Sequence, residues 1–95
     1  MYYIEQICRA NGDVHINVLS DGATKGYFYN KYRKAKPNAP YAEEQPGVGT
    51  VYVDARETRE EALERAGELA QANNTVYGID AGIRRELKTT RRWFG

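Results

Sequence analysis

Hydrophobic and polar residues alternate most regularly over residues 14–18, where every second residue is apolar. This period of two predicts a half-buried strand. The dipeptide Asn11-Gly12 comes just before it and is typical of a two-residue type I′ hairpin turn. The pattern therefore predicts a hairpin of two strands, residues 2–10 and 13–20. In the expected register Cys8 lies opposite His15, and the core side carries Tyr3, Ile7, Val14, Ile16 and Val18.

A second turn of the same kind, Asp21-Gly22, predicts a third strand over residues 24–34. In this arrangement Tyr27 lies opposite Ile16 and Tyr29 lies opposite Val14, so that the same face is extended. A short helix over 27–34 is the alternative, although the density of aromatic residues favours a strand.

All three prolines fall between residues 36 and 49, which predicts an irregular loop over 35–49. Connections of this length are often functional. The run that follows predicts a strand over 50–55, with Val51 and Val53 pointing inward.

The clearest local signal is a helix over residues 58–72. Thr58 and Glu61 have the spacing of a capping box, and Asn73-Asn74 suits a left-handed C-terminal cap. We expect this helix to cover the sheet. Its apolar stripe consists of Ala62, Leu63, Ala66, Leu69 and Ala70.

The remaining residues predict a final strand over 75–79 and a shorter helix over 81–94, capped by Asp80 and carrying Ile83 and Leu87. The expected fold class is α+β. An antiparallel sheet of about four to five strands is covered by one amphipathic helix, with a short C-terminal helix as an addition. We expect a single domain over 1–95, ending in a mobile tail over 90–95.

Charge is unevenly distributed along the 95 residues, although the formal net charge is only +1. Residues 25–36 hold five basic and no acidic residues, residues 43–68 hold eight acidic residues, and residues 84–92 hold five basic residues. Cys8 is the only cysteine, so no disulfide can form within the chain. Together with the absence of a signal-like or membrane-spanning apolar run, this predicts a protein of the bacterial or host cytoplasm.

Few residues could perform catalysis. Ser20 and His15, the only serine and the only histidine, lie five positions apart on one predicted strand and so face opposite sides. Cys8 and His15 would face each other and could form a thiolate–imidazole pair, but a half-buried structural cysteine is favoured because nothing nearby supplies an orienting group. A structural zinc site requires four Cys or His ligands, and the chain has only two such residues. We therefore expect no enzymatic activity, no metal and no cofactor.

Two basic segments that contain aromatic residues are the candidate contact surfaces, because rings stack on bases or bury well in protein interfaces. Alternatively, the tyrosines of 25–36 belong to the core, and the C-terminal Trp93 and Phe94 fold back onto it. A third candidate is a tyrosine flanked by acids in the proline-rich loop. The predicted partner-binding residues are Tyr29, Lys31, Tyr32, Arg33, Lys34, Tyr41, Arg84, Arg85, Arg91, Arg92 and Trp93.

The strand followed by Thr-x-Glu-Glu-Ala-Leu and an amphipathic helix is similar to the sheet–helix core of small antitoxins. Three strands followed by a helix also resemble the arm-binding domains of some integrases. These resemblances cover this segment alone and carry over no residue roles.

The expected function is binding to a larger protein or nucleoprotein complex that is thereby blocked or adapted, as phage-encoded inhibitors of host defence do. The alternative is a nucleic-acid-binding domain that uses the two basic segments, although an isoelectric point of about 7.8 is low for such domains. No membrane partner is expected. A homodimer would be an easy way for so small a chain to gain stability.

Overall fold

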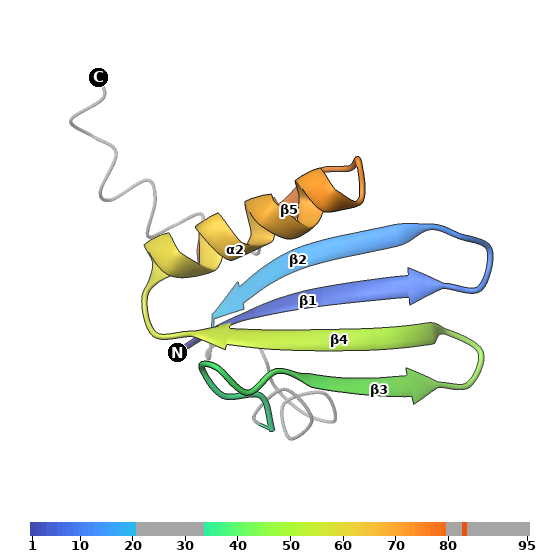
Figure 1. Ribbon diagram of the computed structural model, residues 1–95, viewed down its shortest axis with the longest axis horizontal. Helices are drawn as coiled ribbons and strands as arrows, with labels where there is room; N and C mark the ends of the chain where they lie inside the picture. The colour runs from blue at the N-terminus through green and yellow to red at the C-terminus, as the bar shows by residue number, and fades with distance from the viewer. Residues whose placement is uncertain (21–33, 80–82, 84–95) are drawn as a thin grey trace.

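A computed structural model of the chain describes residues 1–20, 34–79 and 83. These residues form one five-stranded sheet with a single helix on one face (Figure 1). The expected α+β class, with one helix covering a sheet, is confirmed. The elements are β1 (Tyr2–Arg9), β2 (Val14–Ser20), β3 (Tyr41–Gln45), β4 (Gly49–Arg56), α2 (Arg59–Ala72) and β5 (Tyr77–Ile79).

The sheet has the strand order β3-β4-β1-β2-β5, so β1 lies at its centre. Neighbouring strands are antiparallel except for β2 and β5, which are parallel. Helix α2 leaves the end of β4, crosses the face of the sheet over β1 and β2, and delivers β5 to the far edge (Figure 1). A crossover of this kind joins parallel strands. The sheet is therefore mixed, and the prediction of a wholly antiparallel sheet is wrong for β5.

The β1–β2 hairpin differs from the prediction by one residue. The Arg9 N–H donates to the Asp13 carbonyl at 2.8 Å, and the Gly12 N–H donates to the Arg9 carbonyl at 3.0 Å. Gly12 alone has positive φ in this turn, at 95°, which matches a three-residue loop that ends in a left-handed glycine rather than a two-residue type I′ turn. Cys8 consequently pairs with Val14, and Ile7 pairs with His15.

This shift moves side chains between faces, because successive residues of a strand point to opposite sides. Tyr3 and Ile7 lie on the face away from the helix, so the predicted core face that combined them with Val14, Ile16 and Val18 is wrong. The helix-side core consists of Ile4, Ile16, Val18, Ala62, Ala66, Ala70 and Ile83. The core on the opposite face consists of Tyr3, Ala35, Val51, Val53 and Ala55.

Helix α2 begins and ends as its sequence predicts. The Thr58 hydroxyl accepts a hydrogen bond from the Glu61 N–H at 3.2 Å and donates one to the Glu61 carboxylate at 2.8 Å. At the other end Asn74 has a φ of 52°, and the Thr75 N–H donates to the Ala70 carbonyl at 2.9 Å. This is a Schellman cap with asparagine in the left-handed position. Three alanines form the buried stripe of the helix, so the helix can approach the sheet closely.

Residues 35–49 are more ordered than predicted. Residues 41–45 form strand β3, so the expectation of an irregular loop is wrong for this part. Before it, Lys36 and Ala39 exchange two backbone hydrogen bonds around Pro37-Asn38, with Asn38 at a φ of 69°. Proline followed by a left-handed asparagine is typical of a type II turn. The strand predicted over 50–55 is confirmed as β4, and Val51 and Val53 are buried.

The predicted third strand over 24–34 lies outside the described residues except for Lys34. The neighbour predicted for Ile16 there was Tyr27, but β5 pairs with Ile16 on that side through Tyr77. Most of the predicted C-terminal helix over 81–94, and the tail over 90–95, also lie outside; Ile83 is described and is fully buried. In the part of the chain that is described, no helix is long and apolar enough to cross a membrane.

Candidate functional site

Two of the eleven predicted contact residues, Lys34 and Tyr41, belong to the described part of the chain, and they contact each other. The Lys34 Nζ atom lies 5.1 Å from the centroid of the Tyr41 ring. A cation over an aromatic ring at this distance contributes about 0.5–1 kcal/mol at exposed sites. The other nine lie outside the described residues: Tyr29, Lys31, Tyr32, Arg33, Arg84, Arg85, Arg91, Arg92 and Trp93.

Tyr41 begins strand β3, which is the outermost of the five strands on its side. Its ring is half-buried and packs against the core of the face away from the helix. Tyr41 is therefore anchored to the sheet, and is not the exposed loop tip that the sequence suggested. The residue remains partly accessible, and Lys34 lies above its ring.

The basic residues before β3 are held outward by one buried neighbour. Ala35 is only 1% exposed and packs on the sheet, whereas Lys34 and Lys36 on either side of it are exposed. The Pro37-Asn38 turn then reverses the chain into β3. This segment thus presents two lysines and one anchored tyrosine on a single short stretch of the surface.

Glutamates dominate the outer surface of α2. The pKa of Glu60 is lowered by a hydrogen bond from its own backbone N–H and by its bond to Arg59. Carboxylates near a helix N-terminus are also favoured by the helix dipole. The exposed glutamates on this side are Glu57, Glu60, Glu61, Glu64 and Glu68.

Acidic and basic residues are concentrated in different parts of the chain. The described residues carry six lysines and arginines against ten aspartates and glutamates. The remaining residues of the sequence carry eight basic residues against three acidic ones. The sheet and helix therefore form an acidic body, and the positive charge of the chain resides mainly in residues 21–33 and 84–95.

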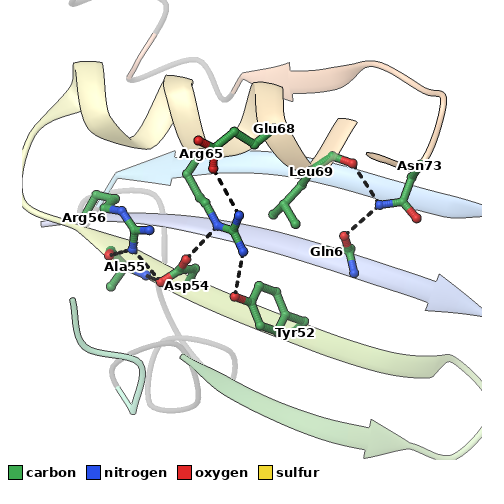
Figure 2. A network of polar contacts seen from close by, with 9 residues as sticks. All are labelled: Gln6, Tyr52, Asp54, Ala55, Arg56, Arg65, Glu68, Leu69 and Asn73. Atoms are coloured by element: carbon green, nitrogen blue, oxygen red, sulfur yellow. Dashed lines mark hydrogen bonds and ion pairs between the residues drawn. The ribbon is translucent and has the colours of Figure 1, made fainter. Parts of the chain in front are cut away.

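A polar network joins α2 to β4 (Figure 2). Arg65 reaches from the helix to the sheet, where its Nε donates to Asp54 Oδ2 at 3.0 Å and its Nη2 donates to the Tyr52 hydroxyl at 3.2 Å. Its Nη1 donates to Glu68 at 3.1 Å. Asp54 also accepts from the Ala55 N–H at 2.8 Å and from Arg56 at 2.7 Å.

This network is structural. Both carboxylate oxygens of Asp54 have partners, and its side chain is only 4% exposed. The bond to Tyr52 is the largest of the contacts that raise the pKa of Arg65 further above its already high value, with Glu68 and Asp54 adding to it. The guanidinium remains charged, and each of its three nitrogens donates one of these bonds. Sequence reasoning missed this clamp, although a single aspartate inside the otherwise apolar run 51–55 is a signal that such a residue has a partner.

The predicted Cys8–His15 pair does not form. Cys8 lies on the helix side of the sheet and His15 on the opposite side, where it is exposed. The Cys8 sulfur accepts a hydrogen bond from Gln6 at 3.5 Å, and Gln6 in turn accepts one from the side chain of Asn73 at 3.1 Å. Ser20 and His15 also face opposite sides, as expected. Over the described ranges, no group of three or more His, Cys, Asp or Glu residues could hold a metal ion.

A buried acid lies on the face away from the helix. Glu5 is 8% exposed, and its carboxylate accepts a hydrogen bond from Asn17 on β2 at 3.2 Å. Burial raises the pKa of Glu5, and the bond from Asn17 opposes this in part. Asn17 itself covers Gly78 of β5, where an added Cβ would lie 2.6 Å from the Asn17 Oδ1. An added Cβ at Gly78 would therefore displace the Asn17 amide from this polar row across β5, β2 and β1.

An open hollow of about 380 Å³ lies between the two hairpin turns, which are at the same end of the molecule (Figure 1). Arg9 and Glu44 bring opposite charges to its lining, and Asn11, Gln45 and Pro46 contribute further. Residues of the two turns make up most of its lining. The hollow is open and mixed in charge, and it brings together none of the predicted contact residues.

In comparisons with known proteins, no protein-family model matches this chain, and neither a curated protein nor a solved structure matches it.

Proposed function

We propose that this chain is a non-catalytic binding protein that docks on a larger protein or nucleoprotein complex. The observation that carries the proposal is the division of charge between an acidic body and basic segments. A protein partner with a negatively charged surface can pair with the basic segments, because protein interfaces pair patches of opposite sign. The contact residues would include Lys34 and the edge of Tyr41, together with the basic residues of 21–33 and 84–95.

The state of the reactive side chains supports a binding role over a catalytic one. The aspartate at the helix–sheet junction is saturated with hydrogen bonds, and the cysteine and the histidine lie on opposite faces. Catalysis by nucleophile and base requires the two groups within hydrogen-bond reach. A chain of this kind would act by covering a surface of its partner. We therefore propose, more narrowly, an inhibitor of the type that phages and mobile elements direct against host defences, acting in the cytoplasm.

The second candidate is a nucleic-acid-binding domain, and it is favoured by the two basic segments. The acidic body weakens it, since ten carboxylates against six basic groups would repel a phosphate backbone. Binding would then depend on residues 21–33 and 84–95 alone.

Fluorescence anisotropy with a random 20-base-pair duplex, measured from about 20 to 200 mM salt, separates the two candidates. We expect no saturable binding at any salt concentration. Saturable binding that falls steeply as salt rises would instead support the nucleic-acid candidate. In that case Glu61→Gln/Glu64→Gln should tighten binding, because it removes two exposed negative charges from the body.

A further inference from the structure

The exposed tip of the β1–β2 hairpin combines an asparagine and a glycine in an unhindered turn. Of the six asparagines in the sequence, only Asn11 is followed by glycine. A Cβ added at Gly12 would meet nothing within 4 Å, and Asn11 and Gly12 are both exposed. The Gly12 nitrogen can therefore approach the Asn11 side chain without the obstruction that a Cβ would add.

One hydrogen bond in the turn polarises the carbonyl of the Asn11 side chain. The Asp13 N–H donates to the Asn11 Oδ1 at 3.0 Å, which draws electron density from the side-chain carbonyl carbon. A donor in this position also stabilises the negative charge that develops on the oxygen when a nucleophile attacks. The Asn11 Nδ2 donates to the Asp13 carboxylate at 3.1 Å.

We propose that Asn11 is a site of spontaneous deamidation. The Gly12 nitrogen loses its proton to solvent base and attacks the Asn11 Cγ; a C–N bond forms, and the side-chain nitrogen takes up a proton and leaves as ammonia. Water then opens the cyclic imide at either carbonyl to give aspartate or isoaspartate. The Gly12 N–H is bonded to the Arg9 carbonyl at 3.0 Å, so the step occurs when the hairpin tip opens locally, as exposed turns do most readily.

The change alters this end of the molecule. It replaces the Asn11 amide, which donates to Asp13, with a second carboxylate beside the first. It also adds a negative charge to the rim of the hollow that Arg9 and Glu44 line. Charge and backbone geometry at the turn change together when isoaspartate forms.

The test is to incubate the folded full chain at 37 °C between pH 6 and pH 9 and to follow tryptic peptides by mass spectrometry. Deamidation adds about 1 Da. Asn38 and Asn74 are matched controls within the chain, because both are exposed but precede Ala39 and Thr75. We expect the mass gain in peptide 10–25, located to Asn11 by fragmentation, at a rate at least about tenfold that at either control.

The rate should rise with pH, and the mass gain at this position should disappear in Asn11→Gln. In Asn11→Asp, which imitates one product, the melting temperature should be lower than in wild type, and the difference should shrink at high salt. The proposal is wrong if peptide 10–25 gains no mass over weeks at pH 9, or if Asn38 and Asn74 react as fast as Asn11.

Discussion

The Arg65 Nε atom donates to the Asp54 Oδ2 atom at 3.0 Å, and this contact joins helix α2 to strand β4. Neither residue belongs to the apolar cores, yet together they fix how α2 lies on β4. Asp54 is nearly inaccessible to solvent, whereas Arg65 keeps a 27% exposed side chain. Because Asp54 is buried, the loss of either partner should substantially lower the free energy of unfolding.

Removal of the Asp54 charge should strongly destabilise the protein. In Asp54→Asn, Arg65 and Arg56 lose their shared carboxylate, and breaking a buried ion pair costs roughly 3–5 kcal/mol. Urea unfolding monitored by circular dichroism measures the loss. The matched control is Glu68→Gln, which removes an exposed partner of the same arginine and should cost less than about 1 kcal/mol. Equal losses in the two variants would show that Asp54 is not the anchor of the network.

Replacement of a buried alanine of α2 by a larger residue should destabilise the protein. Ala66 is completely buried against the sheet, so Ala66→Leu must separate the helix from β1 and β2 or force strained rotamers. Overpacking of this kind typically costs about 1–3 kcal/mol. Ala72→Leu, at the exposed last residue of the helix, is the control and should leave the free energy of unfolding within about 0.5 kcal/mol. If Ala66→Leu proves as stable as Ala72→Leu, the close helix–sheet packing described above is wrong.

Two glycines should respond in opposite directions to the same substitution. An added Cβ at Gly49, where φ is 133°, would lie 2.1 Å from the Cys8 carbonyl oxygen. Gly49→Ala should therefore cost about 3 kcal/mol or more, or prevent folding. At Gly67 within α2 the nearest atom is 4.0 Å away, on Tyr77, and Gly67→Ala should stabilise the protein by about 0.5–1 kcal/mol. Thermal melts of both variants provide the comparison, and a neutral Gly49→Ala would contradict the β1–β4 geometry.

Glu5 should make stability depend on pH in a defined direction. Because burial raises its pKa above the ordinary value of 4.5, the unfolded chain releases this proton at lower pH than the folded chain does. The contribution of Glu5 to the free energy of unfolding is therefore fully present below about pH 4.5. It is lost as the pH rises through the raised pKa of the folded state.

The measurement is the free energy of unfolding from pH 3 to pH 8 for wild type and Glu5→Gln. As the pH rises, wild type should lose free energy of unfolding relative to Glu5→Gln. Asn17→Ala removes the hydrogen bond that partly offsets the effect of burial on the Glu5 pKa. The free energy of unfolding of Asn17→Ala should therefore fall more steeply with pH than that of wild type. Parallel curves for wild type and Glu5→Gln would rule out this role for Glu5.

Signals that act over a few residues were sufficient to predict part of this fold. The capping residues and the apolar spacing of α2 lie within the helix itself, so its position from Thr58 to Asn74 follows directly from the sequence. The strand over 50–55 and the short strand before residue 80 were predicted on the same basis.

Features that depend on distant residues could not be predicted in this way. Asn11-Gly12 fits both a two-residue and a three-residue turn, and the choice depends on which face of β1 meets the helix. The contact of Ile4 with α2 settles it, and that contact is not local. The parallel pairing of β5 with β2 and the Asp54–Arg65 clamp also link residues that are remote in sequence. Lys34 and Tyr41 were each predicted from the sequence as contact residues. That they contact each other was not predicted.

The most direct test of the proposed binding role is quantitative capture from a nuclease-treated host lysate, comparing wild type with Lys34→Glu, Tyr32→Ala and Arg91→Ala/Arg92→Ala. Glu61→Gln, on the acidic face of the body, is the charge-altered control, and circular dichroism verifies that every variant is folded. We predict that wild type and the control retain the same protein complex after nuclease treatment, and that the other variants retain at least about tenfold less, since interface energy concentrates in a few Tyr and Arg residues. Equal capture by all folded variants would contradict the account.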